Sequence, residues 1–204
     1  EYLARNCFLR AAQAKRGGCF PFRSGEADAL FRAVSENPLD GRARLELGNI
    51  LYGRRRDYTA AAACWDAAAK LLPDSPEVFR NLSVSRYNRN NADPEAMAYI
   101  EKALSLDPAN IQLLYERGLL AELQGLPVER RIEMGKSIPL NPALWDDLYL
   151  QGVRLYNQAG LYEESLRLLS THTFIPCEGG EHAVANEYLF AHFALGHRAL
   201  RGGS

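Results

Sequence analysis

Prolines recur along this sequence of 204 residues at an almost constant interval, and that interval limits the possible folds more than any other feature. Five of the ten prolines are separated by 35, 35, 34 and 34 residues; they are Pro38, Pro73, Pro108, Pro142 and Pro176. A fixed period of this length indicates repeated supersecondary units, each too small to bury its own apolar face. The sequence therefore predicts a stack of repeats.

The residue pattern within one period predicts two helices. Residues 43–52 place leucine and isoleucine at helical spacing, and we expect this helix to end at Gly53. Residues 58–72 carry a stripe of alanines. The stretch 74–77 (Asp-Ser-Pro-Glu) combines a capping residue, a proline and an acid, which is a helix-start signal, and Asp-Pro-Glu at 93–95 repeats it. No segment shows sustained period-two alternation, so we expect essentially no sheet.

These positions resemble the tetratricopeptide repeat (TPR), in which a bulky residue, Leu-Gly, an aromatic, Ala, Phe, Ala and Pro stand at fixed offsets. The matching residues, unit by unit, are Leu47, Gly48, Leu51, Ala61, Trp65, Ala68 and Pro73; Phe79, Leu82, Ser83, Ala96, Ile100, Ala103 and Pro108; Leu114, Gly118, Ala121, Gly125, Met134 and Pro142; and Leu148, Gly152, Leu155, Tyr162, Leu168 and Pro176. The resemblance implies an all-α fold, an α-α superhelix in which helical hairpins stack into a TPR-like right-handed solenoid with a concave groove.

Small residues are expected wherever two paired helices cross closely, because a larger side chain would overpack the crossing. The small residues in these places are Gly48, Gly118, Gly152, Ala61, Ala68 and Ala103. Arg130 and Glu164 stand where a small alanine is usual, so we expect the third and fourth units to pack more loosely.

The repeat register predicts a single TPR-like array over residues 1–204. The expected segments are an N-terminal helical hairpin with a Phe-Pro-Phe-Arg loop at 1–39, repeats at 40–73, 74–108, 109–142 and 143–176, and a C-terminal helix at 177–204 that reads as a truncated repeat. Since the first residue is Glu1, we expect a piece of a longer protein, and an upstream signal peptide stays open. The helix at 183–199 is apolar nearly all round, so we expect it to pack on a missing helix or to form a homodimer.

Two short stretches depart from the repeat pattern, at 17–23 and 176–181. With the register, they resemble the C-terminal helical region of bacterial TPR proteins that carry an N-terminal β-rich, carbohydrate-related domain of unknown function. This resemblance implies a larger protein tied to glycoside metabolism. One interpretation makes Arg23 or Glu178 a ligand contact; the other makes both loops structural, fixing the angle between hairpins.

Composition excludes several partners. Lys and Arg total 24 against 25 Asp and Glu, a net charge of −1, which argues against bulk attraction to nucleic acid or to an anionic membrane. No apolar run approaches the roughly 18 residues of a membrane span. The four cysteines (Cys7, Cys19, Cys64 and Cys177) form no CxxC, which indicates reduced thiols and a cytoplasmic protein.

Motifs for catalysis are missing from the sequence. It contains no Gly-rich phosphate loop, no Gly-x-Ser-x-Gly and no HExxH, so we expect no enzyme, no catalytic residue and no cofactor. His172, Cys177 and His182 are five residues apart, but this matches no known zinc spacing, and we expect no metal. The run Arg54-Arg55-Arg56 could hold an anion, although a solvated turn offset by Asp57 is the favoured interpretation.

The concave groove is the remaining candidate site. TPR arrays expose certain positions of each first helix there, and in this register they are Arg42, Asn49, Tyr52, Arg80, Tyr87, Asn88, Gln112, Tyr115, Glu122, Asp146, Tyr149, Tyr156 and Asn157. Tyrosine and asparagine combine rigid apolar area with hydrogen bonding, which suits an extended peptide or a sugar. In the alternative, Tyr52, Tyr87 and Tyr156 pack between adjacent hairpins. Leu45 and Val84 replace the cation and amide of the TPR clamp for chaperone tails, so such a tail is a poor match.

The leading hypothesis is a non-catalytic TPR scaffold whose groove binds a partner protein, a peptide or the missing N-terminal domain. An alternative is an accessory region of a larger bacterial carbohydrate-active protein that contributes to an oligosaccharide site. A purely structural spacer is the third possibility.

Overall fold

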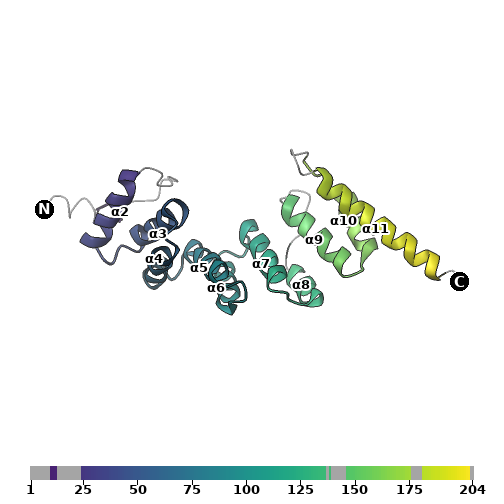
Figure 1. The fold of residues 1–204 in the computed structure, drawn as a ribbon, viewed down its shortest axis with the longest axis horizontal. Helices are drawn as coiled ribbons and strands as arrows, with labels where there is room; N and C mark the ends of the chain where they lie inside the picture. Colours follow the sequence, from purple (N-terminus) through teal and green to yellow (C-terminus); the bar gives the residue numbers. More distant parts are fainter. Residues whose placement is uncertain (1–9, 13–23, 137, 139–145, 176–180, 203–204) are drawn as a thin grey trace. The chain divides into compact units, whose positions relative to one another are not determined.

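Helices make up all the regular structure that is described (Figure 1). The structure, a computed structural model, describes residues 10–12, 24–136, 138, 146–175 and 181–202, and no residue in these ranges lies in a strand. The fold class is therefore all-α, as predicted. Both candidate loop contacts, Arg23 and Glu178, lie outside the described residues. The chain divides into two compact units, residues 1–108 (unit 1) and 109–204 (unit 2), and each is described by itself.

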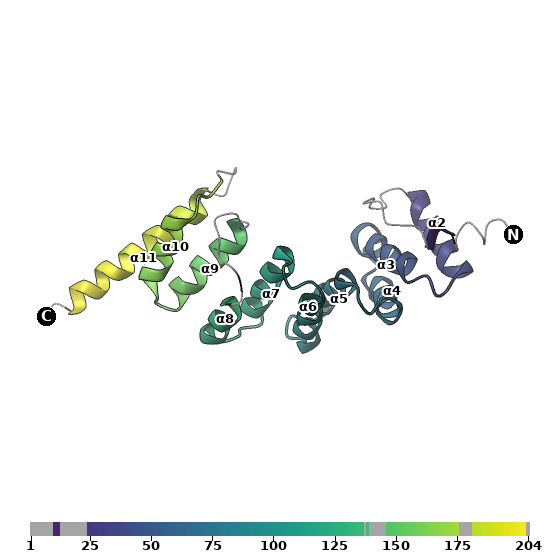
Figure 2. The same ribbon diagram turned by 180° about the vertical axis from the view of Figure 1, so that it is seen from behind.

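Unit 1 is built from paired helices. Its elements are α2 (Ser24–Glu36), α3 (Gly41–Ile50), the π-helical turn η1 (Leu51–Arg55), α4 (Tyr58–Leu71), α5 (Pro76–Arg89) and α6 (Pro94–Leu106). Figures 1 and 2 show from opposite sides that α3 packs beside α4 and α5 beside α6.

Side-chain caps fix the helix starts of unit 1. The carboxylates of Asp40 and Asp57 accept hydrogen bonds from backbone N–H groups three residues on, at 2.9 and 3.0 Å, and Asp93 accepts one from the amide of Glu95 at 3.0 Å. Each bond satisfies an amide that has no partner inside the helix. The start signals at 74–77 and 93–95 are confirmed by α5 and α6.

The expected helix end at Gly53 is wrong. The helix continues through Gly53 as η1, and the chain reverses at Arg56, which has φ +53°. The amides of Arg56 and Asp57 both donate to the carbonyl of Leu51, so the wider π turn satisfies this carbonyl and carries the helix past the glycine.

The core of unit 1 centres on Trp65, which is buried between α3 and α4. Its ring lies so close to Gly48 that a Cβ at that position would stand 2.6 Å from Cδ1 and closer still to Nε1. The indole N–H donates to the carbonyl of Leu45 at 3.3 Å and to Oδ1 of Asn49 at 3.1 Å. The small alanines Ala61, Ala68 and Ala103 are fully buried. The prediction of a close helix crossing at Gly48 is confirmed.

Unit 2 contains α7 (Ile111–Leu123), α8 (Val128–Gly135), α9 (Asp146–Gln158), α10 (Tyr162–Thr171) and α11 (Glu181–Gly202). Gly125 and Gly160 follow α7 and α9 with φ +69° and +74°, a conformation in which glycine has no Cβ penalty. The longest helix, α11, packs against α9 and α10. None of the described helices, in either unit, is long and apolar enough to cross a membrane.

Helix crossings in unit 2 are less tight than the sequence suggested. A Cβ on Gly152 would meet only Cδ1 of Leu168, at 4.0 Å, so the expected close approach there is wrong. At Gly118 it would meet the flexible end of Gln151, with Cδ at 2.7 Å. No residue of α8 is buried, and Arg130, on this helix, is exposed. This agrees with the looser packing expected where arginine replaces a small alanine.

Candidate functional site

The predicted groove residues of unit 1 come from two helices that are one repeat apart. Arg42, Asn49 and Tyr52 lie on α3 and η1, and Arg80, Tyr87 and Asn88 lie on α5; we call these six residues the α3–α5 face. Asn88 is exposed and the other five are half-buried.

Asn49 connects the two helices by hydrogen bonds. Its Oδ1 accepts from Nδ2 of Asn81 at 2.8 Å, in addition to the bond from Trp65, and its Nδ2 lies 3.4 Å from Oε1 of Glu77. A side-chain amide has only a few hydrogen-bonding sites, and these contacts occupy most of them. Asn49 therefore orders the α3–α5 face, and the more exposed α5 residues are better placed to contact a ligand.

Tyr52 and Asn88 form the second connection between these hairpins. The amide Nδ2 of Asn88 donates to the hydroxyl of Tyr52. The Tyr52 ring packs against Tyr58 and Trp65, with centroids 4.9 and 5.2 Å apart. The ring of Tyr52 thus packs on α4 of its own hairpin, its hydroxyl bonds to the next hairpin, and part of its surface stays exposed.

A pocket of about 880 Å³ lies beside this face, among η1, α4 and α5; we call it the unit 1 pocket. Its polar lining includes Tyr52, Tyr58 and Asn88 and the three arginines Arg56, Arg86 and Arg89, with Asp66 as its acidic residue. Arg56 was predicted to lie in a solvated turn, and no role was predicted for Arg86 or Arg89.

The arginine run next to the pocket is exposed, as expected of a turn. Arg55 lies 3.7 Å from Oδ1 of Asp28, and its guanidinium carbon is 5.3 Å from the ring centroid of Phe31. Exposed pairs of this kind contribute little to stability.

Two of the predicted groove residues of unit 2 are interior. Tyr149 is 3% exposed and stacks on His172 with centroids 4.1 Å apart, and its hydroxyl lies 3.0 Å from Oγ1 of Thr171. Asn157 is 4% exposed because α11 covers it, and its Nδ2 donates to the carboxylate of Glu187 at 2.9 Å. The expectation that these two side chains face a partner does not fit their burial.

Asp146 connects the start of α9 to the segment after α10. Its Oδ1 lies 2.7 Å from Nε2 of His172, and its Oδ2 accepts from the amide of Ile175 at 2.8 Å. Burial opposes the charge on Asp146, but the bonds from His172 and Ile175 outweigh it, so the pKa of this carboxyl lies below its ordinary value. Asp146 therefore holds its own chain in place, although it was predicted to bind a partner.

The remaining predicted residues of unit 2 are partly accessible. Gln112 donates to Glu116 at 3.0 Å, and Glu122 accepts from Gln158 at 3.0 Å and lies 3.3 Å from Arg131. Tyr115 and Tyr156 are half-buried.

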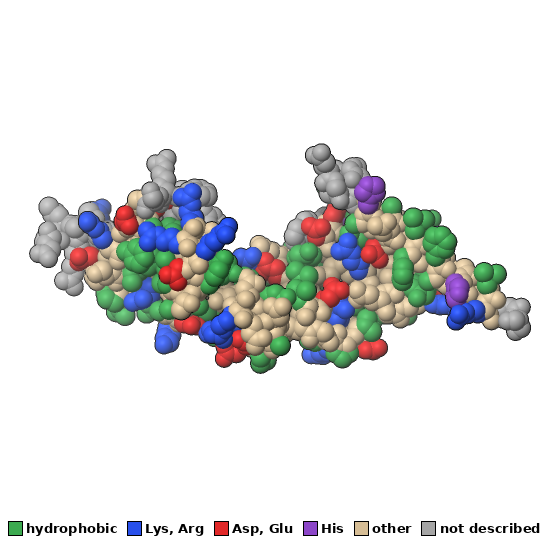
Figure 3. All heavy atoms as spheres, viewed as in Figure 1, with side chains coloured by type: hydrophobic (Ala, Val, Ile, Leu, Met, Phe, Trp, Pro, Cys, Tyr) green, Lys and Arg blue, Asp and Glu red, His purple; other side chains and the backbone are tan. Residues whose placement is uncertain are grey.

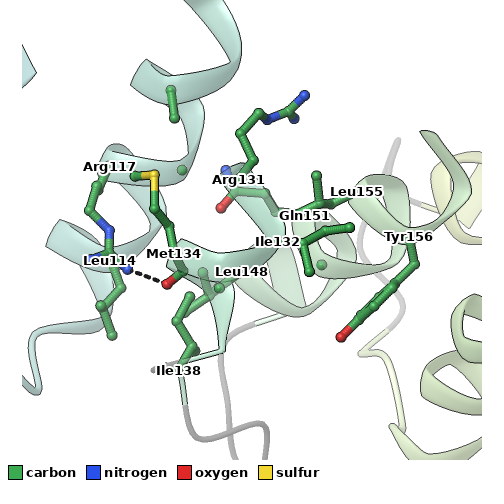
Figure 4. A pocket seen from close by; sticks show the side chains of 14 residues that line it. Leu114, Arg117, Arg131, Ile132, Met134, Ile138, Leu148, Gln151, Leu155 and Tyr156 are labelled. Carbon is green, nitrogen blue, oxygen red and sulfur yellow. Dashed lines mark hydrogen bonds between the residues drawn. The ribbon is translucent and has the colours of Figure 1, made fainter. Parts of the chain in front are cut away.

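A small cavity of about 60 Å³ lies among α7, α8 and α9 in unit 2 (Figure 4). Its labelled lining is mostly apolar, and Arg117 closes one side by donating to the carbonyl of Met134 at 2.8 Å. Ligand pockets usually measure about 300–1,000 Å³. We therefore interpret this cavity as loose packing and not as a ligand site.

One face of α11 is apolar and exposed. Leu189, Phe193 and Leu200 recur at helical spacing, and Phe193 and Leu200 are 76% and 83% exposed. Ala191, on the face that packs inward, is fully buried. Figure 3 shows hydrophobic side chains on the surface over this helix. Exposed apolar patches of this kind are typical of interaction surfaces.

One cysteine lies in the described part of the chain. Cys64 is free, and burial raises the pKa of its thiol; the other three cysteines lie outside the described residues. Within the described ranges no three metal-ligating side chains cluster. His172 contacts Asp146, and Cys177, the proposed neighbour in a metal set, is not described.

Solved structures of similar fold include a protein described as a TPR protein. No protein-family model matches the chain. The structure is similar to that of MamA, with a TM-score of 0.62 and 17% identity over 84% of this chain and 91% of MamA. It is also similar to YrrB, described as a TPR protein with an unusual peptide-binding site, with a TM-score of 0.57 and 18% identity over 84% of each chain. The chain thus has an all-α, TPR-like fold of stacked helical hairpins.

Proposed function

We propose that this chain is a non-catalytic TPR-like scaffold that binds a segment of a partner protein at the α3–α5 face. The observation that carries the proposal is the pair of hydrogen-bonded connections, from Asn49 to Asn81 and from Tyr52 to Asn88, which join two successive hairpins. They fix the spacing of exposed polar and aromatic groups before a ligand arrives, which reduces the entropy lost on binding. The peptide-binding site described for YrrB supports a ligand of this class.

The test selects ligands from a library of random twelve-residue peptides displayed on phage, with the full chain as the target. We expect selected peptides to bind the wild-type chain and to bind Tyr87→Ala at least fivefold more weakly, because Tyr87 offers aromatic area on α5 without being fully buried. Tyr188→Ala is the matched control, since it removes an exposed tyrosine from α11 in unit 2.

Two outcomes would contradict the proposal. One is the selection of no peptide at all. The other is a set of peptides whose affinity is unchanged by Tyr87→Ala and reduced by Tyr188→Ala, which would place binding on unit 2. Circular dichroism of both variants would show whether the fold is intact.

A second candidate is the accessory role, in which this chain contributes to the oligosaccharide site of a larger carbohydrate-active protein. The tyrosines and asparagines of the α3–α5 face favour it, since such side chains also suit sugars. Binding to an array of immobilised oligosaccharides, lost in Tyr87→Ala, would support this role. Binding to peptides but to no sugar would exclude it.

We further propose that the exposed face of α11 pairs with a second copy of the chain. Burial of Phe193 and Leu200 would remove apolar surface from water, at about 25 cal/mol for each Å². Light scattering after gel filtration should give the mass of a dimer for the wild type and of a monomer for Phe193→Ser. A wild-type monomer at high concentration would contradict the pairing.

The free thiol of Cys64 fits a reducing compartment, and we propose the cytoplasm. Fractionation of cells that express the native full-length protein would test this location.

A further inference from the structure

We propose that the unit 1 pocket binds the carboxylate of an aspartate or glutamate side chain in the partner peptide. The inference rests on the proposed function, because it names the chemistry of the segment that lies on the adjoining α3–α5 face. Tyr52 and Asn88 belong to both the face and the pocket lining, so a peptide on the face reaches the pocket directly.

Among the described residues, the charges of the pocket leave one arginine without a carboxylate partner. Arg86 is 14% exposed and lies 3.0 Å from both Asp66 and Glu95, and Arg89 lies 3.1 Å from Asp93. Arg56 also lines the pocket, and no described carboxylate pairs with it. The pocket therefore presents one guanidinium that no carboxylate of the described ranges pairs with, and this group is suited to a bidentate contact with a carboxylate.

Arg86 keeps its charge in this half-enclosed place. Burial opposes that charge, but the contacts with Tyr99, Asp66 and Glu95 outweigh burial, so the pKa of Arg86 lies above its ordinary value. Its pairs with Asp66 and Glu95 hold it against α4 and α6, and it forms a fixed side of the pocket whose charge is balanced.

The backbone at Arg56 gives an independent reason to assign a role to this residue. Arg56 is the one residue other than glycine with positive φ in the described part of the chain, and it ends the π turn η1. Glycine and asparagine adopt this conformation more easily than arginine does. Strained backbone and π turns both concentrate at functional sites.

The pocket favours a carboxylate over a phosphate. A carboxylate carries one negative charge, which a single free guanidinium balances, whereas a phosphate carries nearly two. Asp66 in the lining would repel the additional charge. Tyr52 and Tyr58 give the pocket aromatic walls, which suit the apolar stem of a glutamate.

The test compares two arginine variants with the same change in charge. Arg56→Asn removes the guanidinium but keeps a residue that tolerates positive φ, and Arg54→Asn removes a guanidinium from the same exposed turn outside the pocket lining. Peptides from the phage library are sequenced, and one selected peptide is synthesised with glutamate, glutamine or phosphoserine at its enriched acidic position.

We expect the selected peptides to be enriched in Asp or Glu, and the glutamate peptide to bind Arg56→Asn about tenfold more weakly than wild type, a loss of 1.4 kcal/mol. Arg54→Asn should change its affinity less than twofold. The glutamine peptide should match the loss seen with Arg56→Asn, and the phosphoserine peptide should not bind more tightly than the glutamate peptide.

Outcomes that overturn the inference are distinct from failure of the proposed function. Peptides that need Tyr87 but show no acidic enrichment, or that bind Arg56→Asn as well as wild type, would overturn the carboxylate site alone. Equal losses in both arginine variants would show general charge attraction and would also overturn it. Tighter binding of the phosphoserine peptide would overturn the carboxylate assignment and identify the pocket as a phosphate site. If no peptide is selected, both the proposed function and this inference are contradicted.

Discussion

Replacement of Gly48 by alanine tests the close helix crossing in unit 1. The new Cβ would stand 2.6 Å from Cδ1 of Trp65, well inside van der Waals contact. The Trp65 ring is 2% exposed, so it has little room to retreat. Any shift also weakens the bonds from its N–H to Leu45 and Asn49. We expect Gly48→Ala to destabilise unit 1.

The size of the effect follows from three contributions. Overpacking a filled core costs about 1–3 kcal/mol. A weakened hydrogen bond adds about 1 kcal/mol. In the opposite direction, the higher helix propensity of alanine relative to glycine stabilises the helix by about 1 kcal/mol. The net loss is about 1–3 kcal/mol, which lowers the midpoint of urea unfolding by about 1 M at the slopes usual for small proteins.

Tryptophan fluorescence during urea unfolding measures this loss directly. Trp65 and Trp145 are the two tryptophans of the chain, so a Trp145→Phe background restricts the signal to unit 1. Gly152→Ala is the control for glycine replacement: its Cβ would have no neighbour nearer than 4.0 Å, and circular dichroism should show a gain of up to about 1 kcal/mol. An unchanged or raised midpoint for Gly48→Ala would refute the reasoning.

Three further predictions concern single side chains. Because the pKa of Asp146 is lowered in the folded chain, its contribution to stability is present above the ordinary pKa of 3.8 and is lost as the pH falls through the folded-state pKa. The difference in unfolding free energy between wild type and Asp146→Asn should therefore shrink on acidification from pH 5 to pH 2. A difference that stays constant would contradict this prediction. His172→Ala removes a buried ring that stacks on Tyr149 and should lower the stability of unit 2 by about 2–4 kcal/mol in thermal unfolding, whereas a change below 1 kcal/mol would argue against this packing. The thiol of Cys64 should react with a disulfide reagent at pH 8 much more slowly in the folded chain than in urea, and equal rates would contradict its burial.

Local signals in the sequence were enough to predict most of unit 1. The proline period separates the hairpins, and the start signals at 74–77 and 93–95 fix the starts of α5 and α6. The contact between Gly48 and Trp65 also follows from the repeat pattern, because both positions belong to it. The helix end predicted at Gly53 was wrong, because the π turn satisfies the carbonyl of Leu51 and carries the helix past the glycine.

The candidate site was harder to predict, because it depends on contacts between segments. Tyr149 and Asn157 have the residue types of a binding surface, but His172 and α11, from later in the chain, cover them. From the sequence, Arg56 was predicted to belong to a run of arginines in a solvated turn. Only the fold shows that it lines a pocket with Arg86, which is 30 residues away.

The most direct test of the scaffold assignment is the amide spectrum of the ¹⁵N-labelled full chain, recorded while a selected peptide is added. We predict that the largest shifts fall on residues 80–88 of α5 and on Asn49 and Tyr52, and that they are absent in Tyr87→Ala. Shifts confined to α11 or to the rest of unit 2, with the α3–α5 face unchanged, would contradict the assignment.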